Sequence, residues 1–118
     1  MHFASDNWAG AHPEIMAALA RANEGHAPSY GGDALTKRVE EKFAEIFAHE
    51  VAVFFVATGG AANALALSQL SPPWGMILCH EESHIQMDEC GAPEFFTGGT
   101  KLLPIEGFAG KLTPAAVK

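Results

Sequence analysis

The chain has 118 residues, of which 48% are hydrophobic and 18% are charged, the composition of one globular domain with a modest core. Fourteen Asp and Glu residues outweigh seven Lys and Arg residues, which gives a formal net charge of −7. No Lys or Arg occurs in residues 43–100, so the chain has no basic face with which to neutralise phosphates. This charge distribution argues against nucleic acids and anionic membranes as partners.

The chain also lacks the marks of a membrane or secreted protein. Its longest apolar run, residues 51–57, is far shorter than the about 20 residues that a membrane-spanning helix needs. The first residues have neither the basic nor the apolar region of a secretory signal. Cys79 and Cys90 are too few for a disulfide scaffold and do not form a C-x-x-C pair. These features predict a reduced, cytoplasmic setting.

Two helices are predicted in the first part of the chain. Pro13 suits the first position of a helix over residues 13–24, and Gly25 can end that helix in a left-handed cap. Asp33 is a natural N-cap for a second helix that runs to about residue 48. The apolar side chains of this second helix recur at helical spacing, opposite a charged face.

The remaining elements alternate between strands and a helix. Residues 51–57 are a continuous β-branched and aromatic run, which predicts a central strand of a covered sheet. A helix over residues 61–70 follows, and then two short strands at residues 76–79 and 101–105. A strand–helix–strand order is typical of a parallel sheet, so the predicted fold class is α/β.

The last residues predict the start of a further helix. Thr113 and Pro114 suit its N-cap and first helical position, and the residues up to Lys118 supply about one turn. One turn is too short to be stable alone. We therefore expect residues 1–118 to be the N-terminal portion of a longer protein. The alternative is a frayed natural C-terminus.

The turn Thr58-Gly59-Gly60, which follows the predicted strand, has the features of an anion site. Small residues between a strand and a helix leave backbone N–H groups free at the positive end of the helix, and the Thr58 hydroxyl adds a donor. Neither G-x-G-x-x-G nor a P-loop sequence is present, so neither nucleotide motif is indicated. The alternative is a tight turn that needs glycine only for its backbone angles.

Residues 80–84 match the zinc motif H-E-x-x-H, in which His80 and His84 would bind the metal and Glu81 would act as base. That geometry requires a helix, whereas we expect this segment at the end of a strand and in the loop after it. Two alternatives are a surface loop with two satisfied histidines, and a histidine that lines a ligand site at the carboxyl end of the sheet. We expect no metal site here, and we keep a zinc hydrolase as an alternative function.

Tyr30 lies in a loop between Pro28 and two glycines. Its hydroxyl either contacts a ligand or another subunit, or anchors the loop against the surface. Composition does not separate these two roles.

In this order, the segments resemble the N-terminal part of the threonine aldolases, which are pyridoxal-phosphate enzymes of fold type I. The matching segments are Ser5-Asp6-Asn7, Tyr30-Gly31-Gly32-Asp33, the run from Val53 to Asn63, and Ser83-His84 with Glu89 and Gly91. The resemblance covers nearly all 118 residues. It implies a three-layer fold with a mostly parallel sheet covered by helices, and pyridoxal 5'-phosphate as cofactor.

The resemblance also implies roles for individual residues. Those expected at the cofactor are Thr58, Gly59, Gly60 and His84, and those expected at the substrate are Ser5, Asp6 and Tyr30. The two glycines would bind the cofactor phosphate, and His84 would stack on the pyridine ring. Tyr30 would reach the active site of a neighbouring subunit, so we expect a homodimer or homotetramer. His84 and Tyr30 are the expected catalytic residues.

The implied reaction is cleavage of the Cα–Cβ bond of a β-hydroxy-α-amino acid, as when L-threonine or L-allo-threonine gives glycine and acetaldehyde. The cofactor is the electron sink of this reaction, and the protein supplies orientation and electrostatics. A related β-eliminating lyase is an alternative. Two alternatives from other classes are the zinc hydrolase and an interaction module without catalytic activity.

This sequence departs from the family at two positions. Gly60 stands where the family usually has threonine in the phosphate turn, which removes one hydroxyl donor, and Asn7 stands where the family has threonine in its Ser-Asp-Thr opening. In the family, the lysine that forms a Schiff base with the cofactor lies beyond residue 118. The lysines present here do not match it: Lys37, Lys42, Lys101, Lys111 and Lys118. We therefore expect these 118 residues to be inactive by themselves.

Overall fold

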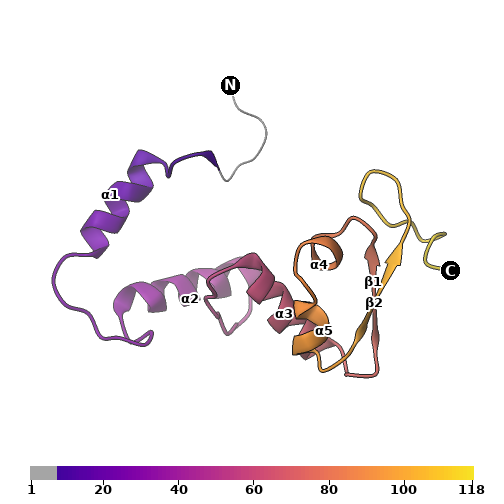
Figure 1. Cartoon of the computed structure of the whole chain (residues 1–118). Helices are drawn as coiled ribbons and strands as arrows, with labels where there is room; N and C mark the ends of the chain where they lie inside the picture. Colours follow the sequence, from indigo (N-terminus) through magenta and orange to yellow (C-terminus); the bar gives the residue numbers. More distant parts are fainter. Residues whose placement is uncertain (1–7) are drawn as a thin grey trace. The chain divides into compact units, whose positions relative to one another are not determined.

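The computed structural model describes residues 8–118, and the chain divides into two compact units with the boundary between Val53 and Phe54. The first unit contains helices α1, Pro13–Ala22, and α2, Ala34–Phe47 (Figure 1). Both predicted helices are therefore confirmed, and α1 ends two residues earlier than expected. Neither helix is long and apolar enough to cross a membrane, and the same holds for every other helix in the described part of the chain.

Both ends of α2 follow from its sequence. The Asp33 carboxylate accepts hydrogen bonds from the backbone N–H groups of Leu35 and Thr36, each at 2.9 Å, which caps the first turn. The helix ends at Ala48, a left-handed residue with a φ of 50°. The carboxylate also accepts a bond from the Thr36 hydroxyl, and these bonds lower the pKa of Asp33.

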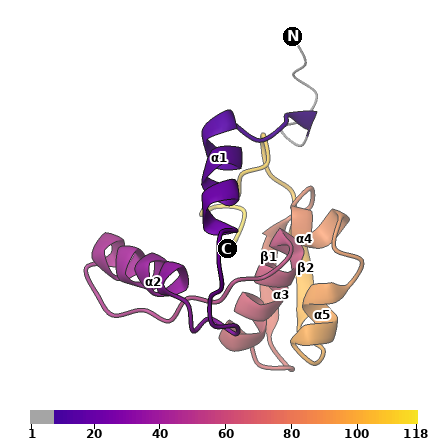
Figure 2. The ribbon, with the colours of Figure 1, turned by 90° about the vertical axis from the view of Figure 1, so that its left-hand side faces the viewer.

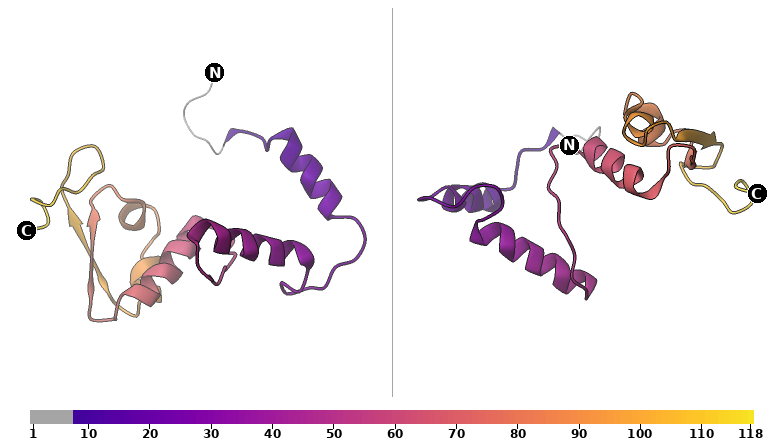
Figure 3. Two further views of the ribbon diagram at one scale, coloured as in Figure 1. Left: turned by 180° about the vertical axis from the view of Figure 1, so that it is seen from behind. Right: turned by 90° about the horizontal axis from the view of Figure 1, so that it is seen from below.

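The second unit builds a parallel sheet with helices on one side (Figure 1, Figure 2). Its elements, in chain order, are α3, Gly59–Leu70; β1, Met76–His80; α4, His84–Met87; α5, Ala92–Phe96; and β2, Lys101–Ile105. β1 and β2 lie side by side, with Met76 opposite Lys101 and His80 opposite Ile105; Figure 3 shows the pair from behind. The α/β class and the two short strands are thus confirmed.

Two predicted elements are absent. Residues 51–56 have no regular secondary structure, although their composition predicts a central strand. A strand exists only through hydrogen bonds to a neighbour, and within the described residues β1 and β2 pair with each other alone. Residues 114–117 form a turn rather than a helix, although the Thr113 hydroxyl accepts a bond from the backbone N–H of Ala116 at 3.2 Å.

Buried positions in the second unit are mostly polar. Its buried apolar residues are Ala64, Cys79 and Pro93, and its buried polar residues are His80, Glu89, Thr97 and Thr100. The Thr100 hydroxyl donates to the Pro72 carbonyl at 2.5 Å, and the Thr100 N–H donates to the Thr97 hydroxyl at 3.2 Å. These bonds tie the end of α5 and the start of β2 to the loop before β1. Large apolar side chains remain exposed, among them Phe54, Leu70, Trp74, Phe95 and Phe108.

His80 fixes the carboxyl end of β1. It is 6% exposed, and both nitrogens of its ring are engaged. Nδ1 accepts a hydrogen bond from the backbone N–H of Glu82 at 3.0 Å, so in the neutral ring Nε2 carries the hydrogen and donates to the Gly107 carbonyl at 3.1 Å. His80 is thus a structural residue that joins β1 to the loop after β2.

We predict that Gly107→Ala lowers the free energy of unfolding by about 1–3 kcal/mol, as overpacking does elsewhere. A Cβ at this position would collide with the Lys111 carbonyl and with the His80 ring. Urea titration of the purified protein measures the effect. Gly10→Ala is the matched control, because a Cβ there meets no atom within 4 Å. Equal stabilities of the two variants would contradict this account of His80.

Candidate active site

A pocket of about 540 Å³ lies in the second unit, between the first turns of α3 and the segment from α4 to α5. Three predicted site residues line it: Thr58, Gly60 and His84. The other lining residues are Ala61, Ala64, Leu65, Asp88, Glu89, Ala92 and Phe96. His84 follows shortly after β1, so this pocket lies close to the carboxyl end of a parallel strand, the usual place for ligands in such sheets.

The first turn of α3 is the part of the pocket suited to an anion. The Thr58 hydroxyl accepts from the backbone N–H of Ala61 at 3.1 Å, and the Thr58 carbonyl accepts from the N–H of Ala62 at 3.2 Å. The N–H groups of Gly59 and Gly60 precede the first intrahelical bond, so the helix itself gives them no acceptor. They point along the positive end of the helix dipole, which favours a phosphate-like group without any basic side chain.

Space at this turn differs between the two glycines. A Cβ on Gly59 would meet nothing within 4 Å, so the position is open. A Cβ on Gly60 would make ordinary contact with the Glu89 side chain at 3.7–3.9 Å. Gly60 thus lines the pocket against a side chain of the protein, whereas Gly59 is exposed beside it and does not line the pocket.

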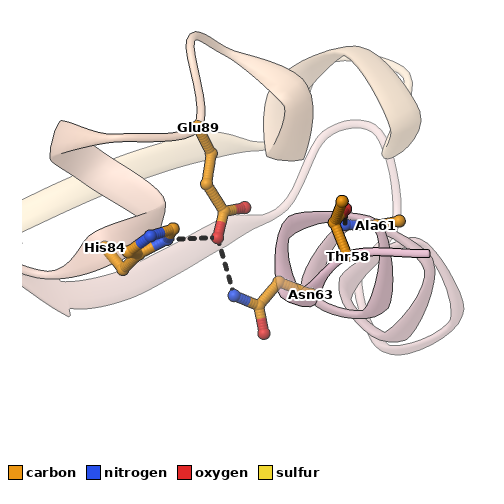
Figure 4. A network of polar contacts seen from close by, with 5 residues as sticks. All are labelled: Thr58, Ala61, Asn63, His84 and Glu89. Atoms are coloured by element: carbon orange, nitrogen blue, oxygen red, sulfur yellow. Dashed lines mark hydrogen bonds and ion pairs between the residues drawn. The ribbon is translucent and has the colours of Figure 1, made fainter. Parts of the chain in front are cut away.

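The Glu89 carboxylate joins three elements of the pocket (Figure 4). Its Oε1 accepts from the Asn63 side-chain amide on α3 at 2.7 Å and lies 2.8 Å from Nδ1 of His84. The side chain is 3% exposed, and Oε2 is buried with no hydrogen-bond partner among the described residues. The bond from Asn63 lowers the pKa of Glu89, burial opposes this, and the bond and charge of His84 lower it further. Glu89 is therefore a buried carboxylate.

His84 is the first residue of α4, and its side chain is 65% exposed. The contact of its Nδ1 with Glu89 holds one edge of the ring, while most of the ring remains accessible. An accessible imidazole held by a buried carboxylate can stack on a ligand or exchange a proton with it.

The structure separates the two histidines of the H-E-x-x-H match. His80 ends β1 and His84 begins α4, so they do not lie one turn apart on a helix as a zinc peptidase requires. Both nitrogens of His80 are already bonded within the protein. Among the described residues, no group of three or more His, Cys, Asp or Glu side chains is arranged to hold a metal ion.

The remaining predicted residues lie elsewhere. Tyr30 is in the first unit, fully exposed, with a left-handed φ of 58° beside Gly31, whose φ is 79°. Ser5 and Asp6 lie outside the described residues. Sequence reasoning assigned no role to Glu89 or Asn63, although both belong to matched segments. They are 26 positions apart, and only the fold brings them into contact.

Comparison with known proteins identifies the class. The chain matches the beta-eliminating lyase family over residues 2–118 and belongs to that family. Two curated relatives, each named low specificity L-threonine aldolase, come from Pseudomonas sp. (strain NCIMB 10558) and from Pseudomonas aeruginosa PAO1. Each is 47% identical over 116 residues, which is 98% of this chain and 34% of the relative. The chain thus spans about a third of the length of these relatives.

A solved structure of a threonine aldolase is also similar to this chain. Threonine aldolase from Leishmania major matches with a TM-score of 0.80 and 28% identity, over 92% of this chain and 32% of that one. This similarity confirms the predicted fold class, an α/β arrangement of fold type I.

We predict that Glu89 makes the fold sensitive to acid. Its pKa is lowered in the folded state, so the ionised carboxylate stabilises the protein above the ordinary glutamate value of about 4.3. That stabilisation is lost as the pH falls through the lowered pKa. The free energy of unfolding should therefore fall more steeply between about pH 5 and pH 3 in the wild type than in Glu89→Gln. Urea unfolding at several pH values measures this.

Glu82→Gln serves as the control for this titration, because Glu82 is an exposed acid of the same segment. Its pH profile should follow that of the wild type. Parallel profiles for the wild type and Glu89→Gln would contradict the prediction.

Proposed function

We propose that the chain is the N-terminal portion of a pyridoxal-phosphate-dependent aldolase that cleaves β-hydroxy-α-amino acids such as L-threonine or L-allo-threonine. The products are glycine and an aldehyde, acetaldehyde for threonine. The observation that carries this proposal is the 47% identity to low specificity L-threonine aldolases over 98% of the chain. The enzyme is proposed to act in the cytoplasm as a homodimer or homotetramer.

The pocket fits the proposed cofactor. A phosphate ester needs several donors in an open cradle, and the first turn of α3 supplies free N–H groups, the Thr58 hydroxyl, and open space at Gly59. We assign the phosphate to Thr58, Gly59 and Gly60, and the pyridine ring to His84. When bound, pyridoxal phosphate supplies an electron sink for the bond that is cleaved.

The residues of the chain have separate tasks in this proposal. The helix start anchors the anionic end of the cofactor, and His84 orients its ring beside the substrate. Ser5 and Asp6 are assigned to the substrate. Tyr30 is assigned to the active site of a neighbouring subunit, which its complete exposure supports. The lysine that holds the cofactor is assigned to a part of the enzyme beyond these 118 residues.

The decisive experiment uses the full-length protein with the cofactor. We expect an absorbance band of protein-bound pyridoxal phosphate, and formation of glycine and acetaldehyde from L-threonine. Release of pyruvate from L-serine, with no aldehyde from threonine, would indicate a β-eliminating lyase instead. Inhibition by chelators with reversal by zinc, and no cofactor band, would indicate the metal hydrolase. Neither chromophore nor metal would indicate an interaction module.

We predict that Gly59→Val weakens cofactor binding roughly 10- to 100-fold, the effect of losing one charge-assisted hydrogen bond. The valine side chain has room in the protein but fills the cradle that we assign to the phosphate. Equilibrium titration followed by absorbance measures this. Ala62→Val is the matched control, an exposed position in the same helix, and should bind as the wild type does. Unchanged affinity in Gly59→Val would mean that the turn is only structural.

We predict that activity returns when two inactive variants of the full-length protein are co-expressed. One variant carries Tyr30→Ala, and the other lacks the cofactor-binding lysine. A hybrid dimer would hold one site with both residues intact, so random mixing gives about one quarter of wild-type activity. Each variant expressed by itself, without exchange of subunits with the other, should remain inactive. An active full-length monomer, or no recovery in proven hybrids, would defeat the assignment of Tyr30 to a neighbour.

A further inference from the structure

The contacts of Glu89 form a continuous connection from the anion-binding helix to His84. Asn63 lies on α3, one turn beyond the helix start at Thr58 and Gly59. Its amide donates to Oε1 of Glu89 at 2.7 Å, and the same oxygen lies 2.8 Å from Nδ1 of His84 (Figure 4). The three side chains thus meet at one oxygen atom, although they come from α3, α4 and the loop between α4 and α5.

The burial of these groups shows which of them is fixed. The His84 side chain is 65% exposed, whereas the Glu89 side chain is 3% exposed. An exposed ring rotates freely about its side-chain bonds unless something holds it. Among the described residues, the hydrogen-bond partner of the His84 ring is Glu89. The buried Glu89 carboxylate therefore fixes the position of the exposed His84 imidazole.

The chemistry of the contact also sets the position of a proton. A carboxylate oxygen that already receives the Asn63 amide can only accept from His84, so Nδ1 must carry the hydrogen. In the neutral imidazole, Nε2 is then the unprotonated nitrogen, an acceptor available to a ligand in the pocket. Water would not hold the hydrogen on Nδ1, because it can donate to or accept from either nitrogen, and the intrinsic preference of the neutral ring for a hydrogen on Nε2 then decides.

We propose that Glu89, held by Asn63, is a positioning residue that fixes the ring orientation of His84 and keeps the proton on Nδ1. The role of His84 toward the cofactor rests on the proposed function, whereas the state of its ring does not. Asn63 ties the arrangement to α3, so the anion-binding turn and the imidazole keep a constant separation. Glu89 itself touches neither cofactor nor substrate in this proposal.

The test is the protonation of His84, read by nitrogen NMR. The full-length protein is labelled with ¹⁵N-histidine and studied as a microcrystalline solid at about pH 8.5, some two units above the ordinary histidine pKa. The His84 signals are assigned by their loss in His84→Gln. We expect a proton on Nδ1 in the wild type. In Glu89→Ala we expect an unprotonated Nδ1, because the neutral ring in water prefers the hydrogen on Nε2.

Glu82→Ala is the matched control, since it removes an exposed carboxylate from the same segment and should leave Nδ1 protonated. An unprotonated Nδ1 in the wild type overturns the inference, even if Glu89→Ala does not fold. An Nδ1 that stays protonated in folded Glu89→Ala also overturns it. Neither readout requires cofactor or turnover, so a protein that binds no pyridoxal phosphate yet shows the expected shift would refute the proposed function alone.

Discussion

A single buried carboxylate organises the pocket of this chain. Two donors converge on one oxygen of Glu89, one from the helix that starts at the anion-binding turn and one from the histidine after β1. Removing a carboxylate from water is costly unless hydrogen bonds replace its hydration. Those two donors replace the hydration of Oε1, whereas Oε2 is buried with no partner among the described residues. The bonds to Oε1 outweigh the burial and lower the pKa of Glu89. The pocket keeps its shape because this charge requires both partners.

The sequence predicted helices and strands well where the deciding signal is local. One such signal is a side chain that hydrogen-bonds to backbone N–H groups a few residues away. Asp33 is an example, because a side-chain oxygen within three residues of a free N–H group determines where a helix begins. Thr58 caps α3 in the same way, but the start of that helix was predicted at residue 61, two residues too late. The two short strands were also found, since both are β-rich runs bounded by turn residues. The turn of small residues at the start of α3 was also located, although the residues before it do not form a strand.

The helix expected from residue 114 is absent although Thr113 supplies its local cap. The other features that were missed from the sequence have a different cause, since they depend on groups far away in the sequence. Residues 51–57 have the composition of a central strand, but composition cannot supply the hydrogen-bonding neighbour that defines one. Glu89 and Asn63 were seen as parts of a matched pattern, yet their contact spans 26 positions and required the fold. The bond by which His80 joins β1 to Gly107 spans 27 positions, so it too became visible only in the fold.

The turn to which we assign the phosphate is made of main-chain groups, in a stretch of 58 residues that contains no lysine or arginine. Main-chain donors are common to every amino acid except proline, so most point mutations along α3 leave them in place. Charge reversal, the commonest way to destroy a phosphate site made of side chains, has nothing here to act on. The anchor can therefore persist while the side chains around the pocket diverge, and new substrate preferences can evolve without loss of the group that holds the ligand.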